Sequence, residues 1–487
     1  MRSSKIFLFI LTAVALLALL CLFFPADGVK LFGITLRFPS LERIMTREEK
    51  FNMDAFLSDE QRRQDSIAKV LSDSTDYYIA LLNDSATRFY LPDDNFTFFD
   101  AMFATMDSAQ HQQRTVRVLH YGDSQVEMDH MTSRLRSALQ EQFGGGGPGL
   151  LPLNGFTPVT AAQIWANGSY EKLSSFGDST VSRSSGNYGP MMQCHRINGA
   201  VSAGIRPAAH RDSNDRILLI DHLRVLFNNR GGTFSASLDV PAAGYSQAFS
   251  SSAEGVQHFD WQLDSIAAKI SLHYSGSADF YGIMADYGHG VAVDNIPMRG
   301  CSGHQFKGVR ADLLTAAYSQ MDVSLIILQF GGNSVPYIRG EKALERYCEE
   351  LGEQIDHLHA CCPNATILFI GPSDMTSTGE GTWQTWRFLP NIVEGLRQMA
   401  NQHGAAYWSI YDAMGGWNSM KSWVDNGYAG KDYMHFTQKG ADIMGDRLAQ
   451  ALLLQYEYYK FRQRGADFNL SDCSSNNPKQ SEPISSR

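Results

Sequence analysis

The chain has few of the features that mark nucleic-acid-binding or metal-binding proteins. Its 487 residues include 41 Lys and Arg against 51 Asp and Glu, a formal net charge of −10, and no strongly basic block is present. Because binding to nucleic-acid phosphates needs clustered Lys and Arg, this balance argues against nucleic acid as the main partner. The sequence has no Cys-x-x-Cys pair and no visible cluster of metal ligands. We therefore expect neither a metal nor a cofactor.

The glycine run Phe143-Gly-Gly-Gly-Gly-Pro-Gly149 also lacks a defining feature. A phosphate-binding loop ends in Gly-Lys-Ser or Gly-Lys-Thr and opens a helix, and this run does neither. We interpret it as a flexible loop near the functional site.

Cysteine is scarce, with seven residues in the chain. Cys21 lies in an apolar N-terminal run, and spacing does not fix any pairing of the other six. Disulfides in an exported chain and buried free thiols both remain open. The six residues are Cys194, Cys301, Cys348, Cys361, Cys362 and Cys473.

The N-terminus has the pattern of an export signal, because a short positive flank precedes an apolar run from Ile6 to Phe24. The run is long enough to cross a bilayer, and no convincing cleavage site follows it. We predict an uncleaved anchor over residues 1–28, with the bulk of the chain outside the cytoplasm, periplasmic in a Gram-negative bacterium. A cleaved signal peptide is the alternative.

The rest of the chain is too long for one ordinary core, so we expect two domains plus extensions. Charged, helix-forming sequence predicts a helical stalk or linker over 29–112. Continuous apolar runs at 115–121, 323–330, 365–370 and 405–410 predict buried parallel strands, with helices between them and a closing helix over 439–454. The predicted α/β domain therefore occupies 113–160 and 290–464. It is interrupted at 161–289 by alternating apolar and polar residues that predict an antiparallel β-sandwich, and a polar, disordered tail follows at 465–487.

The strand at 115–121 ends in Gly122-Asp123-Ser124, which predicts a tight turn with an exposed hydroxyl at the end of the sheet. A serine hydroxyl is a weak nucleophile and needs a base within hydrogen-bond reach. His435 is the candidate base, and Asp432, three residues earlier, is the carboxylate that would orient its imidazole. The sequence therefore predicts a Ser124–His435–Asp432 catalytic triad.

An acyl-transfer site also needs donors for the oxyanion of its tetrahedral intermediate. We assign this role to the Ser124 N–H, the Gly300 N–H and the side-chain amide of Asn333. Glycine suits position 300 because a side chain there would obstruct the acyl group.

In this order, the blocks Gly122-Asp-Ser124, Asn295 to Gly300, Gly331-Gly-Asn333 and Asp432-x-x-His435 resemble those of the SGNH (GDSL-type) hydrolases. The residues that follow Ser124, together with the glycine run, resemble the bacterial peptidoglycan O-acetylesterase branch. This resemblance implies a three-layer α/β/α domain with a parallel sheet. It also implies that the insertion is similar to a carbohydrate-binding module.

Some residues depart from the family pattern. Ser334 follows Asn333 where many relatives have an acidic residue, Gln125 stands where some acetylesterases have His, and Gly303 is a possible substitute for Gly300. We predict that Asp123, Gln125 and His304 contact substrate.

For other candidate side chains, the sequence allows either a structural or a functional role. We expect His120 to be packed and Asp374 to cap local structure. His130 is a weaker candidate for substrate contact. Trp383 and Trp386 either stack on sugar rings or are buried.

Three functions fit these residues. The first is an extracytoplasmic serine esterase that removes O-acetyl groups from an envelope glycan, with peptidoglycan as the substrate that the resemblance implies. The second is a membrane-anchored O-acyltransferase, with a membrane-bound O-acyltransferase as possible partner. The third is a non-catalytic glycan-binding protein. The partners expected are thus an acetylated glycan and, through the anchor, the membrane.

Overall fold

The computed structural model describes residues 75–155, 158–177, 182–184, 186–206, 218–263, 269–377 and 383–475, with a few short stretches and single residues before residue 75. The chain divides into two units, Met1–Phe51 and Asn52–Arg487. In the first unit, β1 (Val29–Leu31) and β2 (Ile34–Leu36) form an antiparallel pair. Apart from Thr12, the predicted anchor lies outside the described residues. Among the helices that are described, none is both long and apolar enough for a membrane span.

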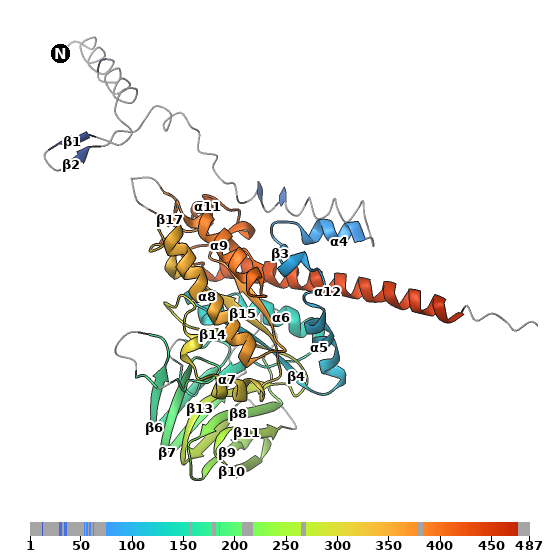
Figure 1. Ribbon diagram of the computed structural model, residues 1–487. Helices are drawn as coiled ribbons and strands as arrows, with labels where there is room; N and C mark the ends of the chain where they lie inside the picture. Colours follow the sequence, from blue (N-terminus) through green and yellow to red (C-terminus); the bar gives the residue numbers. More distant parts are fainter. Residues whose placement is uncertain are drawn as a thin grey trace, which may run out of the picture. The chain divides into compact units, whose positions relative to one another are not determined.

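The second unit contains a six-stranded sheet whose first five strands are parallel (Figure 1). The apolar runs predicted as buried parallel strands are confirmed, although the last strand is shorter than expected because Ile410 already begins a helix. In spatial order the strands are β14 (Gly290–Pro297), β4 (Thr115–Gly122), β15 (Val323–Gln329), β16 (Thr366–Ile370), β19 (Ala406–Trp408) and the antiparallel edge strand β3 (Phe89–Tyr90).

Helices cover both faces of this sheet. Side chains alternate along β4, so Leu119 and Tyr121 enter a core with the residues of one helix group, while His120 faces the other group. The predicted three-layer α/β/α arrangement around a parallel sheet is therefore confirmed. The first helix group comprises α7 (Ala311–Tyr318), α8 (Glu341–Cys361) and α9 (Leu389–Gln402), and the second comprises α5 (Asp100–His111), α6 (Thr132–Phe143) and α12 (Gln438–Ser475).

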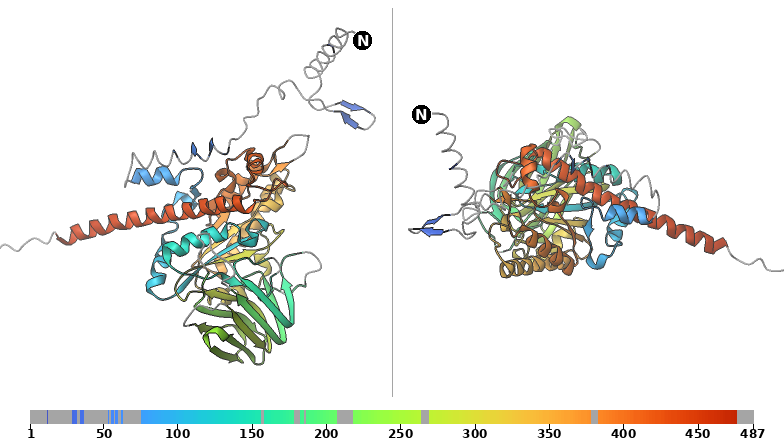
Figure 2. Two further views of the ribbon diagram at one scale, coloured as in Figure 1. Left: turned by 180° about the vertical axis from the view of Figure 1, so that it is seen from behind. Right: turned by 90° about the horizontal axis from the view of Figure 1, so that it is seen from above.

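The predicted stalk at 29–112 is wrong for its second half. The helix α4 (Thr75–Leu82) packs Tyr78 and Leu82 against Leu454 and Tyr458 of α12, β3 completes the sheet, and α5 contacts β4, β14 and β15. The closing helix is also longer than the predicted 439–454. It continues to Ser475, into the predicted tail (Figure 2), and beyond residue 454 its Tyr456 and Tyr458 pack against aromatic rings of α5 and α4.

The insertion forms a nine-stranded antiparallel sheet, seen at the bottom of Figure 1. The alternation predicted at 234–240 is confirmed, because every second residue of β9 is buried. The strands are β5 (Gly149–Leu151), β6 (Gln163–Ser174), β7 (Gln193–Arg206), β8 (His222–Asn229), β9 (Phe234–Val240), β10 (Tyr245–Ser251), β11 (Gly255–Gln262), β12 (Ile270–Ser275) and β13 (Ser277–Asp286).

This sheet branches at the long strand β7, which pairs with β12 over one half and with β13 over the other. The branch β12-β9-β10 and the branch β13-β8-β11 share a core in which the rings of Phe227 and Phe234 lie 4.8 Å apart. Hydrogen bonds join all nine strands, so a sandwich of two separate sheets remains a prediction. The insertion also begins earlier than residue 161, since β5 pairs with β13.

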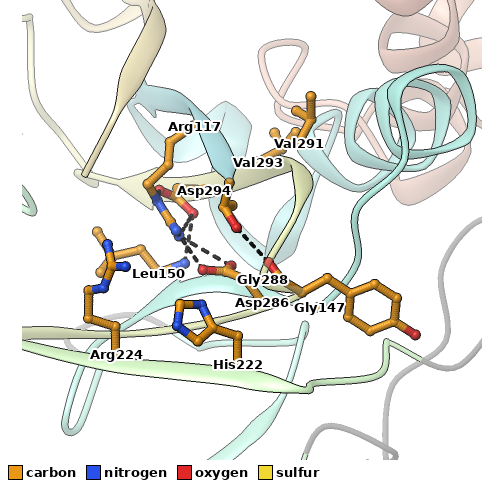
Figure 3. Close-up of polar contacts among 12 residues, drawn as sticks. Arg117, Gly147, Leu150, His222, Arg224, Asp286, Gly288, Val291, Val293 and Asp294 are labelled. Atoms are coloured by element: carbon orange, nitrogen blue, oxygen red, sulfur yellow. Dashed lines mark hydrogen bonds and ion pairs between the residues drawn. The ribbon is translucent and has the colours of Figure 1, made fainter. Parts of the chain in front are cut away.

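A buried ion cluster ties the insertion to the parallel sheet (Figure 3). Arg117 of β4 donates to Asp286 at the end of β13 (2.5 Å) and to Asp294 of β14 (2.8 and 2.9 Å). Asp294 also accepts the backbone N–H of Leu150 in β5. Burial raises the pKa of Asp286 despite the neighbouring guanidinium. The two sheets of this unit therefore meet through a charge network that solvent does not reach.

Candidate active site

Ser124 stands at the carboxyl end of β4, where the chain turns into the short 3₁₀ segment η2 (Ser124–Asp129). The turn begins at Gly122, where an added Cβ would lie 2.8 Å from a methyl group of Val126. Asp123 caps the segment by accepting the N–H of Gln125 at 2.9 Å. Glycine and the cap together present the Ser124 hydroxyl at the edge of the sheet.

The structure brings the three predicted triad residues together. Ser124 Oγ lies 2.7 Å from Nε2 of His435, and His435 Nδ1 lies 2.8 Å from Oδ2 of Asp432. The side chains of His435 and Asp432 are 41% and 51% exposed, so the site opens to solvent. The chain of two short hydrogen bonds is the geometry that activates a serine hydroxyl.

One short loop sets the geometry of Asp432 and His435. Asp432 Oδ1 accepts the backbone N–H groups of Met434 and His435, both at 3.1 Å, while Tyr433 adopts a left-handed backbone with φ of 57°. Burial by itself would raise the pKa of Asp432, but the hydrogen bonds from His435 and Met434 outweigh it and hold the pKa below its ordinary value. Asp432 therefore stays ionised and can accept the imidazole N–H.

Gln125 holds this loop from the opposite side. Its Nε2 donates to the carbonyl of Met434 at 2.7 Å, and its Oε1 accepts the N–H of Phe436 at 3.3 Å. The side-chain amide thus binds the backbone on both sides of His435. These recorded contacts of Gln125 lie within the protein, and its contact with substrate stays a prediction.

Asp123 is buried, with 4% exposure, and binds the side chain of Asn333. Burial raises the pKa of Asp123 to about 6, although the Gln125 N–H and the Asn333 amide act in the opposite direction. The recorded contacts of Asp123 lie within the protein, where its carboxylate orients Gln125 and Asn333, and its contact with substrate stays a prediction.

Asn333 lies after β15, in the short segment η6 (Gly332–Ser334). Its Nδ2 donates to Asp123 Oδ2 at 3.0 Å and to the carbonyl of Cys301 at 2.9 Å. Both N–H bonds of the amide are thus engaged, so donation to an oxyanion requires Asn333 to share or release one of them. Its assignment as an oxyanion donor stays a prediction.

Gly300 and Gly303 differ in their surroundings. Gly300 has φ of +77°, which favours glycine, and a Cβ added there meets no atom within 4 Å. A Cβ on Gly303 would lie 2.7 Å from Leu351, so this glycine is required by packing. Gly300 borders open space and, among the described residues, no acceptor is recorded for its N–H. The Gly303 N–H has no recorded acceptor either, so the open space beside Gly300 is what distinguishes the two glycines.

His304 packs against α8, which carries Tyr347 and Glu350. Its ring meets Tyr347 edge to face at 5.3 Å, and Nε2 lies 3.6 Å from Glu350. Burial lowers the pKa of His304. The recorded contacts of His304 give no support to its predicted substrate contact.

The structure also settles several secondary candidates. His120 is buried between Gln329 and Thr132, and burial lowers its pKa to about 4, as expected for a packed histidine. Asp374 accepts the Met420 N–H and the Thr385 hydroxyl, so it caps local structure.

Other candidates lie elsewhere in the unit. His130 is half-buried, and its electrostatic neighbours are Gln438 and Asp442 of α12. Trp386 is partly buried against the core, whereas Trp383 is 46% exposed.

The cysteines and potential metal ligands form no further site in the described part of the chain. Cys194, Cys301, Cys348, Cys361 and Cys362 are free thiols. No group of three or more His, Cys, Asp or Glu residues there is placed to hold a metal ion.

Sequence reasoning missed the role of Gln125 as a clamp. A glutamine beside a nucleophile is as consistent with ligand contact as with loop contact. Only the arrival of residues 434–436 beside it in space distinguishes the two, and no local pattern encodes that contact.

Comparison with known proteins agrees with this fold. The model of the GDSL-like Lipase/Acylhydrolase family matches residues 264–443. That range holds Gly300, Asn333, Asp432 and His435 but not Ser124, which the insertion separates from them. A search of curated proteins finds no match.

Among solved structures, a peptidoglycan O-acetylesterase is 22% identical with a TM-score of 0.60, and the match covers 77% of this chain and 99% of that one. A family two carbohydrate esterase from Clostridium thermocellum is 11% identical with a TM-score of 0.24, covering 53% and 93%. The periplasmic domain of a Salmonella lipopolysaccharide acetyltransferase is 13% identical with a TM-score of 0.25, covering 34% and 73%. Only the first likeness is close enough to show a shared fold.

Proposed function

Because the chain carries a hydrolase domain of the GDSL-like lipase/acylhydrolase family, we propose that it is a serine esterase that removes O-acetyl groups from a cell-envelope glycan. The hydrogen-bonded line from Ser124 Oγ through His435 to Asp432 carries this proposal. Likeness in fold to a peptidoglycan O-acetylesterase makes O-acetylated peptidoglycan the proposed substrate.

In the first half of the reaction, Ser124 Oγ attacks the acetyl carbonyl carbon while Nε2 of His435 takes the hydroxyl proton. The carbonyl oxygen becomes an oxyanion, for which the proposed donors are the N–H of Gly300, which borders open space, and the N–H of Ser124. When the tetrahedral intermediate collapses, the C–O bond to the sugar breaks. His435 returns its proton to the departing sugar oxygen, and the acetyl group stays on Ser124.

In the second half, water attacks the acetyl carbon of Ser124 and His435 takes a proton from it. The ester bond to Ser124 breaks, acetate leaves, and the hydroxyl is restored. Asp432 remains a carboxylate throughout and holds the imidazole in the tautomer that presents Nε2 to Ser124. Exposure of the imidazole and the carboxylate suits this step, because water reaches the site from solvent.

The proposed setting is the outside of the cytoplasmic membrane. The charged flank and apolar run at the N-terminus support an anchor there, and the envelope glycan would then be the partner within reach. The insertion is proposed to act as a β-sandwich of the carbohydrate-binding type beside the catalytic unit. Its shared apolar core supports an independent layer.

The deciding experiment measures acetate released from O-acetylated peptidoglycan by the full-length chain. Ser124→Ala is the test variant, and Ser319→Ala, at the end of α7, is the matched control. Acetate release that is lost in Ser124→Ala and kept in Ser319→Ala supports the esterase. Acetyl transfer to an added glycan, without release, would instead indicate an acyltransferase, and release by Ser124→Ala would overturn the nucleophile assignment.

A further inference from the structure

Most of the large apolar side chains recorded as exposed belong to loops that follow strands of the parallel sheet. Five such residues are recorded, and four of them follow the carboxyl ends of β4, β15, β16 and β19, which lie at the edge that holds Ser124. The fifth, Ile79, lies on α4. The four are Met128 (48% exposed), Tyr337 (81%), Trp383 (46%) and Trp417 (45%).

Scattered exposed apolar residues need no explanation, but a group of them beside a reactive site does. Trp383 makes the closest connection to the catalytic loop. Its ring centroid lies 4.1 Å from that of Tyr433, with the planes tilted by 30°. Because Tyr433 stands between Asp432 and His435 in the chain, the indole lies directly against the loop that positions the base.

Trp417 belongs to the same surface. The hairpin of β17 (Thr376–Ser377) and β18 (Gln384–Thr385) carries Trp383, and two hydrogen bonds join Thr385 to Asn418, at 3.1 and 2.8 Å. Figure 1 places β17 beside α11 (Ser419–Asp425). Trp417 is next to Asn418 in the sequence, and Trp383 is two residues before Thr385. The connection joins the two loops that carry these tryptophans.

Polar groups border the rings. The carboxylate of Asp432 is half exposed, and the N–H of Thr376 fixes the carbonyl of Tyr433 at 3.2 Å. A pyranose ring has an apolar C–H face surrounded by hydroxyls, which matches an aromatic face with polar neighbours. The face of an aromatic ring is negative and attracts such C–H groups.

We propose that Trp383, packed against Tyr433 and with Trp417 on the adjoining loop, forms a sugar-binding subsite that stacks one pyranose ring of a glycan chain beside the triad. The inference rests on the proposed function and deepens it, because it assigns the residues that hold the polymer. The acetylated sugar would occupy the position at Ser124, and a neighbouring sugar of the same chain would occupy the indole face.

The test measures binding of chitotetraose, a tetramer of N-acetylglucosamine, by isothermal titration calorimetry to the full-length Ser124→Ala protein. Adding Trp383→Ala should weaken binding about tenfold, because an aromatic anchor is lost. Trp383→Phe keeps a ring and should weaken it by about threefold or less. Ile79→Ala, which removes an exposed apolar side chain elsewhere, is the matched control and should bind as the parent does.

Equal affinity of Trp383→Ala and its parent would overturn the subsite. Because Trp383→Phe keeps a ring, it distinguishes loss of the stacking ring from collapse of the loop. No chitotetraose binding by a parent whose wild-type form hydrolyses p-nitrophenyl acetate would overturn the subsite while leaving the nucleophile intact. Trp383-dependent binding by a protein that releases no acetate from any glycan would support the subsite and remove the proposed esterase function.

Discussion

His435 and His120 belong to the same α/β unit, yet their surroundings differ in almost every physical respect. The side chain of His435 is 41% exposed and bridges Ser124 and Asp432. His120 is fully buried, and its two ring nitrogens are bound by Gln329 and Thr132. An imidazole can act as a general base only where it can exchange a proton with a reacting group.

Two aspartates, Asp432 and Asp286, repeat this contrast. Asp432 stands at the solvent edge, where hydrogen bonds keep its pKa below the ordinary value, whereas burial raises the pKa of Asp286 beside Arg117. The exposed carboxylate of Asp432 costs little free energy to place and is available for catalysis. The buried group must be matched on every side, because an unpaired charge in the interior is strongly destabilising.

The first way to sharpen this comparison is to remove the nucleophile at the open edge. Ser124→Ala should lower kcat by a factor of about 10⁴ or more while the melting temperature stays within 1–2 °C of the wild type, roughly what a change of under 0.5 kcal/mol allows. Release of p-nitrophenol from p-nitrophenyl acetate and thermal unfolding measure the two effects. Substantial remaining turnover would show that another residue attacks the ester.

Asp432→Asn should have the next largest effect, a fall in kcat of about 10³, because the amide no longer fixes the tautomer of His435. Its stability should change little, since the side chain is half exposed. Rates of hydrolysis and urea unfolding of the same sample provide the measurement. Wild-type rates would remove Asp432 from the triad.

Arg117→Met should lower stability, unlike the two variants above, because Arg117 is buried. Asp286 and Asp294 would be left buried without their counter-charge, which should cost about 3–5 kcal/mol of unfolding free energy. The control is Lys307→Met, which breaks an exposed pair with Glu353 and should cost less than about 1 kcal/mol. Equal losses in the two variants would contradict the contrast between buried and open charges.

The buried imidazole predicts a dependence of stability on pH. The folded pKa of His120, about 4, lies below the value of about 6.5 for an exposed imidazole, so the unfolded chain binds more protons below pH 6.5. Its contribution is complete above pH 6.5 and is lost as pH falls towards 4, amounting to about 2 kcal/mol between pH 7.5 and pH 5. The measurement is urea unfolding at both pH values.

His120→Gln keeps a polar side chain and removes this titration, so the difference between wild type and variant isolates His120. Other buried groups change both proteins alike. Burial raises the pKa of Asp374 to about 6, which has the opposite sign and favours the folded state as pH falls. The same pH slope in both proteins would show that His120 is accessible to protons in the folded chain.

Gln125 gives the smallest effect and lies between the two regions. Gln125→Glu replaces the donor to the Met434 carbonyl by a carboxylate, which should loosen the His435 loop and lower kcat about tenfold with KM unchanged. Gln125→Ala should act in the same direction. A rise in KM with kcat unchanged would instead indicate that Gln125 contacts substrate.

The sequence was sufficient for the parts of the molecule that local pattern controls. Apolar runs predicted the parallel strands, and the blocks at Ser124, Gly300, Asn333 and Asp432 to His435 predicted which residues the fold brings to one edge. Each block follows a strand or precedes the last helix, and parallel strands share an edge by construction. The site was predictable because topology, not detailed packing, assembles it.

What the sequence did not predict depends on contacts between distant segments. Residues 75–112 are charged and helical like a stalk, but their apolar faces are buried by α12 and by the sheet. Gln125 and Asp123 bind protein groups that arrive from residues 333 and 434–436. Such partners have no local signature, so propensity and periodicity cannot choose between a surface and a contact.

The position of the insertion has a consequence for how the chain folds. The whole branched sheet lies between β4 and β14 in the sequence, yet these two strands are neighbours in the parallel sheet, with Thr115 paired to Gly290. Bringing together segments so far apart carries a loop-closure cost and slows folding. A branched sheet that forms first would bring its two ends close, since β5 at its start pairs with β13 at its end. Assembly of the edge that carries Ser124 and Gly300 would then be a late event, timed by a region that holds neither residue.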